Sequence, residues 1–221
     1  MPLSKGYPLF GKNCFDDPQI CNYHGTTFSM TGGTLGMVEL QYHINDEENA
    51  TGLPATYKLG MWYQADGAFP DQRTGANHDD DYGIYAVLDQ AVYQGDAFGA
   101  SVFARVGVAP NDRNLVSFYA DSGFGLTGLI PGRDEDVLTF GVAYMDIGGK
   151  AEQADIDAAL PVVRDYELAL ELNYLAQLTP WWTLQPDLQY IVNPGGKVPH
   201  PVTNAEVDDA FVVGLRSAFT F

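Results

Sequence analysis

The feature of this sequence that most constrains its fold is a recurring segment of about ten residues in which apolar and polar side chains alternate. In residues 166–174, Tyr, Leu, Leu, Leu and Tyr take every second position, with Glu, Ala, Glu and Asn between them. The pattern recurs at 182–192, 38–44, 56–64, 138–144 and 211–221, and more weakly at 82–93, 98–108 and 115–124. Successive side chains of a strand point to opposite faces, so the sequence predicts nine strands. A helical period appears only briefly, near residues 151–160.

The length and the aromatic ends of these segments distinguish them from soluble strands. Soluble strands usually have about 5–6 residues, whereas a strand tilted across a bilayer needs about 9–11. Aromatic residues end the apolar faces, as at Tyr57 and Tyr63 or Tyr166 and Tyr174, where a membrane barrel has its two girdles. Pro186 removes one ladder donor, so we expect a bulge there. The expected fold class is all-β, a transmembrane antiparallel β-barrel.

The connections between the segments alternate in length, as they do in outer-membrane barrels, whose periplasmic turns are short and external loops long. If the chain ends in the periplasm, the expected external loops are 193–208, 148–164, 109–114, 66–81 and the residues before about 34. The expected periplasmic turns are 178–180, 128–136, 94–97 and 45–55. One domain, 1–221, then consists of an external segment, 1–33, and barrel strands from 34 onward.

Composition excludes several other classes of protein. The net charge of -18, from 11 Lys+Arg and 29 Asp+Glu, argues against nucleic acid as a partner and against a basic protein of the membrane surface. No run of about 18 apolar residues predicts a transmembrane helix. Residues 1–30 show no secretory signal, which is expected of a mature chain or of a fragment. Since lipid offers no hydrogen bonds, the sheet must close, and nine is an odd number, so further N-terminal strands are expected.

Two cysteines, Cys14 and Cys21, lie in a polar segment, and we expect a disulfide that closes a small external loop. A zinc site and two free thiols are the alternatives. The histidines have no paired spacing, and no Ser/His/Asp or Cys/His arrangement occurs. We therefore expect no enzyme, no metal site and no cofactor. The aspartates at 79–81 are expected to be a solvated external loop rather than a divalent site.

The polar faces supply the candidate functional residues. The candidates to line a pore and contact sugar are Arg105, Arg216, Glu39, Gln41, Trp62, Tyr119, Glu167, Glu171, Asp187 and Gln189. Charged and amide groups hydrogen-bond sugar hydroxyls, and aromatic faces pack on C–H groups. We expect both arginines to face the carboxylates of 167, 171 and 187 across a lumen; the alternative is that these groups only solvate it or pair among themselves. Arg133 is expected to form an Arg–carboxylate staple within its turn.

Several motifs resemble the carbohydrate-selective porin family of OprB type over about residues 28–221. The residues that carry the resemblance are Leu184-Gln185-Pro186-Asp187-Leu188-Gln189-Tyr190-Ile191, Asn193-Pro194-Gly195-Gly196, Gly128-Leu129-Ile130-Pro131-Gly132-Arg133-Asp134-Glu135-Asp136, Gly107-Val108-Ala109-Pro110, Gly141-Val142-Ala143-Tyr144, Gly214-Leu215-Arg216 and Phe221. The resemblance implies a barrel of about sixteen strands that passes sugars, especially glucose, across the bacterial outer membrane. This chain would be its C-terminal half.

The expected partners follow from that resemblance: sugars, outer-membrane lipid and lipopolysaccharide, the barrel insertion machinery and a second chain that completes the barrel. The aromatic C-terminus, Phe221, resembles the signal that the insertion machinery reads. The main alternative is a non-conducting half-barrel, a structural or accessory subunit completed by another chain. An outer-membrane lipase and a soluble β-sandwich are the remaining alternatives.

Overall fold

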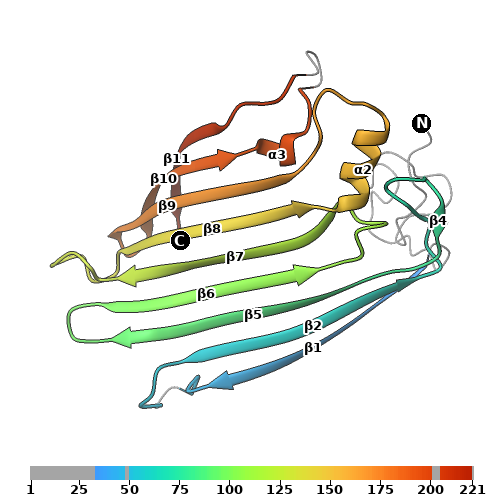
Figure 1. Cartoon of the computed structure of the whole chain (residues 1–221). Helices are drawn as coiled ribbons and strands as arrows, with labels where there is room; N and C mark the ends of the chain where they lie inside the picture. Colours follow the sequence, from blue (N-terminus) through green and yellow to red (C-terminus); the bar gives the residue numbers. More distant parts are fainter. Residues whose placement is uncertain (1–32, 48–49, 201–204, 221) are drawn as a thin grey trace, which may run out of the picture.

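Nine long strands form one antiparallel sheet in the computed structural model of the chain, which describes residues 33–47, 50–200 and 205–220 (Figure 1). Their order in the sheet is their order in the chain. The strands are β1 (Thr34–Ile44), β2 (Ala55–Ala65), β5 (Asp81–Gln94), β6 (Gly99–Val108), β7 (Val116–Thr127), β8 (Val137–Ile147), β9 (Tyr166–Thr179), β10 (Trp182–Val192) and β11 (Ala210–Phe219). All nine predicted strands are thus confirmed.

Each strand pairs with its chain neighbours through hairpins, and the register shifts at three places. One shift lies between Trp182 and Thr183 of β10. The bulge expected at Pro186 is absent: Leu184 pairs with Ala176 and Asp187 with Asn173, so the register is the same on both sides of it. The irregularity instead follows the tight turn into β10, where the strand direction reverses.

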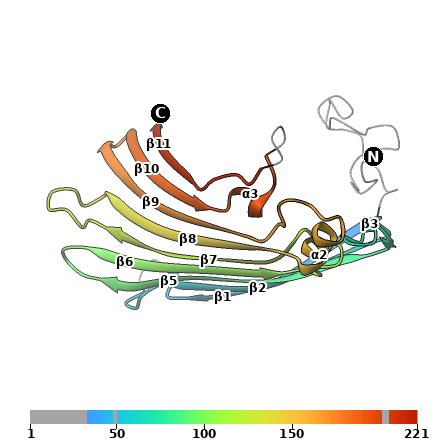
Figure 2. The same ribbon diagram turned by 45° about the horizontal axis from the view of Figure 1, so that its top comes forward.

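The sheet is a single curved layer with almost no apolar core (Figure 2). In the described part of the chain, the buried apolar side chains are only Ala55, Ile147, Ala151 and Ala176. The apolar side chains of the strands lie on an uncovered face, where Leu40 is 69% exposed and Leu172 42%. Among the described residues, β1 and β11 are the two edges of the sheet and do not pair with each other.

The three longest connections gather at one end of the sheet (Figure 1); the exceptions to the expected alternation are the short loop between β6 and β7 at that end and the longer turn between β1 and β2 at the other. The long end carries α2 (Gly149–Asp157), α3 (Pro194–Lys197) and a small hairpin of β3 (Phe69–Pro70) and β4 (Asn77–His78). This alternation is the one predicted from loop lengths, and α2 overlaps the predicted helical segment. No helix in the described ranges has the length and apolarity needed to cross a membrane.

Both helices are fixed at the end of the sheet by specific contacts. Asp155 of α2 accepts hydrogen bonds from Arg164, at 2.7 Å from Nε and 2.7 Å from Nη2, in a two-point pair. Gly196 of α3 has φ +67°, and a Cβ there would lie 2.7 Å from Ile147 Cγ1. A glycine is therefore required on both counts, conformation and space.

The turn 128–136, at the short end, has a buried carboxylate at its centre. Asp136, 3% exposed, accepts hydrogen bonds from Arg133 Nε at 2.7 Å, from the Gln177 N–H at 2.9 Å and from the Tyr174 hydroxyl. The predicted Arg133 staple is confirmed. Burial by itself would raise the pKa of Asp136, but its three donors outweigh burial and hold that pKa below the usual range.

Replacing Asp136 with Asn should lower the free energy of unfolding by about 1–3 kcal/mol, because the turn loses charge-assisted hydrogen bonds. Urea unfolding of the protein folded in lipid vesicles measures this. Since the folded-state pKa is depressed, the stabilisation is present above the unfolded-state pKa of about 3.9 and is lost as pH falls through the folded value. The variant should therefore lose less stability than the wild type below about pH 4.

Asp134→Asn is the matched control, because Asp134 is exposed in the same turn. Equal losses of stability in the two variants would contradict a specific role for Asp136.

Candidate functional site: the polar face of the sheet

Strand register places all ten candidate residues on the polar face. Directly paired residues of an antiparallel sheet share a face, and the pairs Glu39↔Gly60, Trp62↔Gly83 and Gly107↔Tyr119 extend that face from β1 to β7. The pairs Gly141↔Glu171, Gln189↔Glu171 and Gln185↔Arg216 carry it on to β11. The candidates Gln41, Arg105, Glu167 and Asp187 lie an even number of residues from members of these pairs. That they line a pore or contact sugar stays a prediction.

The pair of Arg105 and Asp121 is the best-defined charged group on this face. The two residues lie opposite each other on β6 and β7, and Arg105 donates from Nε at 2.9 Å and from Nη2 at 2.5 Å. The Tyr119 hydroxyl donates to the same carboxylate at 2.6 Å. Asp121 has 5% side-chain exposure and Arg105 57%, so a nearly buried anion holds a cation that faces the open side.

That Arg105 and Arg216 face the carboxylates of β9 and β10 across a lumen stays a prediction, but the direct neighbours of both arginines are defined. Arg105 is paired with Asp121, which is not among the ten candidates. The hairpin register sets these two residues directly opposite each other. Arg216 lies opposite Gln185 and makes no ion pair within the described residues. A signal for Asp121 did exist, since it has the same strand parity as Tyr119.

The carboxylates of β9 and β10 are instead held by neighbouring amides. Gln189 donates to Glu171 at 3.1 Å and to Asp187 at 3.3 Å, and Asn173 donates to Glu171 at 3.0 Å. Two carboxylates thus share one amide and present hydrogen-bond acceptors to the open side.

At the end of the sheet that carries the long loops, α3 approaches the polar face. Glu167 accepts a hydrogen bond from the Gly195 N–H at 2.5 Å, and Lys197 pairs with Asp165 at 3.3 Å. Among the predicted pore residues, Glu167 therefore has a structural contact, because its carboxylate binds the α3 loop to the sheet.

Of the three aspartates at 79–81, Asp79 is exposed as expected, whereas the other two are held by neighbouring side chains. Asp80 accepts from Arg113 Nη1 at 2.6 Å, and Asp81 is 5% exposed and accepts from Asn114 at 2.8 Å. The adjacent Asp112 also binds Arg113, whose guanidinium lowers the pKa of that carboxyl. The short loop between β6 and β7 supplies both partners, so it fixes the long loop beside it.

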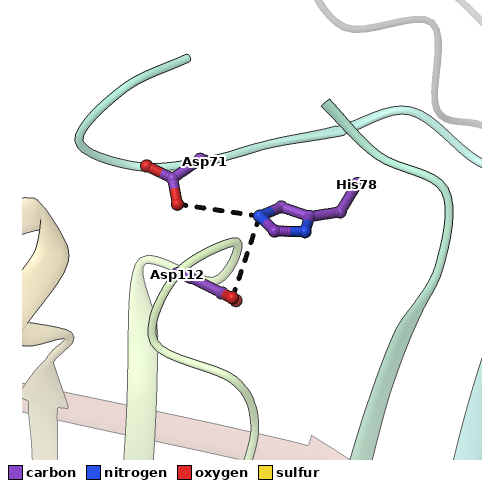
Figure 3. A group of neighbouring side chains, drawn as sticks. All are labelled: Asp71, His78 and Asp112. Carbon is purple, nitrogen blue, oxygen red and sulfur yellow. Dashed lines mark ion pairs between the residues drawn. The ribbon is translucent and has the colours of Figure 1, made fainter. Parts of the chain in front are cut away.

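Asp71, His78 and Asp112 converge at the same end (Figure 3). His78 Nε2 lies 3.6 Å from an Asp71 oxygen and 3.7 Å from an Asp112 oxygen. The N–H and the hydroxyl of Thr74 hold the pKa of Asp71 at about 2, so this carboxylate stays ionised. His78 thus lies between carboxylates of two neighbouring loops.

The donor atoms of these three residues lie within 4.8 Å of one another. One imidazole nitrogen and two carboxylate oxygens are the ligand types that zinc and similar divalent ions accept. The sequence pattern does not reveal this group, because Asp112 comes from a different loop and no ligand spacing joins it to Asp71 and His78.

Three predicted positions, Cys14, Cys21 and Phe221, lie outside the described residues. The disulfide and the insertion signal therefore stay predictions.

Comparisons with known proteins agree on one family. The model of the carbohydrate-selective porin, OprB family, matches residues 13–221. Porin B of Pseudomonas aeruginosa is 30% identical over 226 residues, which cover 89% of this chain and 48% of that protein. The putative porin QuiX of Acinetobacter baylyi is 27% identical over 187 residues, covering 77% and 41%. This chain spans about half the length of the curated relatives it matches.

A solved structure shows the same fold. The high-pH structure of Pseudomonas putida OprB superposes with a TM-score of 0.74 at 27% identity, covering 93% of this chain and 54% of that one. The resemblance seen in the motifs is thereby confirmed: this chain belongs to the carbohydrate-selective porin family of OprB type.

Proposed function

We propose that this chain forms part of the wall of a water-filled pore through which sugars diffuse passively across the bacterial outer membrane. The observation that carries the proposal is the two-sided, single-layer sheet, with one apolar face and one polar face. Membership of a porin family supports a channel rather than an enzyme.

The apolar face fits lipid. Soluble monomers rarely expose contiguous apolar patches beyond a few hundred Å², whereas here the uncovered face extends over all nine strands. Val38 is 63% exposed and Val213 68%. Aromatic side chains meet at both ends of this face, for example Tyr42 with Tyr57 at 6.5 Å and Tyr144 with Tyr166 at 5.6 Å between ring centroids. Two such belts fit the two membrane interfaces.

The edges of the sheet support a larger barrel. In lipid each unpaired backbone N–H or C=O costs several kcal/mol, so β1 and β11 need further partners. We propose that the chain is the C-terminal half of a barrel of about sixteen strands, with the α2–α3 end external and the short turns in the periplasm. That the chain spans half the length of its relatives supports this.

The polar face fits an uncharged, hydroxyl-rich solute such as a glucose-type sugar. Arg105 offers donors on one side of the face, and Glu171 and Asp187 offer acceptors on the other. Such groups can replace the hydrogen bonds that sugar hydroxyls make with water. Contacts with lipid and lipopolysaccharide outside, recognition of Phe221 by the insertion machinery and a disulfide between Cys14 and Cys21 belong to the same proposal.

A second candidate function is a half-barrel that a separate chain completes and that does not conduct by itself. The two unpaired edge strands favour it, because they would serve equally well as an interface with a second polypeptide.

Replacing Arg105 with Ala should shift ion selectivity toward cations and change sugar flux several-fold, because it removes the cation and leaves Asp121 without its partner. Single-channel recording in planar bilayers and sugar-driven swelling of liposomes measure the two effects. Lys150→Ala, an exposed position on α2, controls for the loss of one positive charge. Unchanged selectivity and flux in the Arg105 variant would remove Arg105 from the pore.

The backbone amides of β1 and β11 should be protected from hydrogen exchange as strongly as those of β6 and β7 when the protein is in its native membrane. This is expected because a closed sheet leaves no edge. Mass spectrometry of exchanged peptides measures it. Fast exchange confined to the two edge strands would indicate an open sheet and refute closure; protection that needs a second polypeptide would support the split barrel.

A further inference from the structure

We propose that Trp62 and Tyr85 form a stacking platform for the pyranose ring of a sugar, and that Gly60 and Gly83 hold both aromatic rings flat against the sheet. This inference rests on the proposed function, since it assigns a sugar site within that pore.

The platform originates in a reciprocal register between β2 and β5. Tyr85 lies opposite Gly60, and Trp62 lies opposite Gly83, two residues further along. Each strand thus contributes one aromatic residue and one glycine, and each aromatic residue faces the glycine of the other strand. The two pairs lie on the polar face, about 7 Å apart along the strands.

Each ring covers its glycine closely. A Cβ added to Gly83 would lie 2.5 Å from Nε1 of Trp62, and one added to Gly60 would lie 2.2 Å from Cζ of Tyr85. Both glycines are buried, while Trp62 and Tyr85 are half-buried. The side chains therefore lie along the sheet instead of standing up from it, and a side chain at either glycine would lift the ring.

The Tyr85 hydroxyl is anchored on the far side of β2. It donates to Glu39 of β1 at 2.6 Å, and Glu39 lies opposite Gly60 on that side. Gln41 donates to the other oxygen of Glu39 at 2.5 Å. The tyrosine thus spans β2 completely, and a carboxylate and an amide lie at the edge of its ring.

This combination matches the surface of a sugar ring. One face of a pyranose carries C–H groups, which pack on an aromatic face, while its hydroxyls at the rim need hydrogen-bond partners. A hollow of about 190 Å³ adjoins the platform, and its lining includes Trp62, Tyr85, Gly107 and Tyr119. The hollow gives the solute room beside the rings.

The outward faces of the two rings are uncovered. The helix α3 contacts β8 and β9, which are several strands away from β2 and β5 in the same sheet. Among the described residues, no second layer covers the two rings. The ring faces directed away from the sheet are therefore available to a solute.

Half-blocking sugar concentrations from single-channel recordings of the full-length protein test the proposal, with glucose and maltose as probes. Gly83→Ala and Trp62→Leu should each raise that concentration about two- to tenfold, because the stacking contact is lost. Trp62→Phe should retain most of the block, since it keeps an aromatic face.

Gly141→Ala is the matched control. Gly141 lies on the same polar face, and an added Cβ would meet its nearest atom at 3.8 Å, an ordinary contact. The control should leave the block by sugar unchanged.

The outcomes separate this inference from the proposed function. A wild-type protein that conducts ions but is not blocked by sugar contradicts the proposed sugar pore. A wild type that sugar blocks, together with wild-type block in Trp62→Leu and Gly83→Ala, overturns the platform alone. If Gly83→Ala does not fold, as judged by its heat-modifiable migration on gels, the comparison of Trp62→Leu with Trp62→Phe decides.

Discussion

The hydrogen-bond ladder between neighbouring strands is the interaction on which the rest of this structure depends. A single layer has no apolar core to hold it together, and the described part of the chain buries only four apolar side chains. Its cohesion therefore comes from eight successive antiparallel pairings, each over ten or so residues. The apolar face of this single layer is larger than soluble proteins usually expose, which supports the proposed contact with lipid.

The register of the ladder also decides which side chains are neighbours on the polar face. Arg105 meets Asp121, Gln189 meets Glu171, and Trp62 and Tyr85 each meet a glycine because hairpins place them opposite one another. A slip of one residue in the register of a strand would turn the side chains of that strand to the apolar face. The well-ordered turns, such as the one around Asp136, therefore contribute to function indirectly, by holding the register.

The charged side chains of the loops and those of the polar face have different partners. At the end of the sheet with the long loops, Arg113 and Arg73 neutralise aspartates of a neighbouring loop, and Arg164 neutralises Asp155 within its own loop. On the sheet, Lys58 and Arg216 have no ion pair within the described residues, while Glu171 and Asp187 are held by amides. The loops thus use their charges for structure, and the polar face keeps part of its charge available to solutes.

The sequence by itself determined the strands, their two faces and the alternation of loop lengths, because period-two alternation is local and can be recognised without knowing which residue lies opposite. The family was indicated by short motifs, which are also local in the sequence. It also placed all ten candidates on one face and identified the staple at Arg133. Only the tertiary structure decided the partners: Asp121 for Arg105, Gly60 for Tyr85, and Asp112 for His78. Parity gives the face of a residue, but its neighbour across the ladder depends on hairpin register and loop folding, which join positions 16 to 34 residues apart.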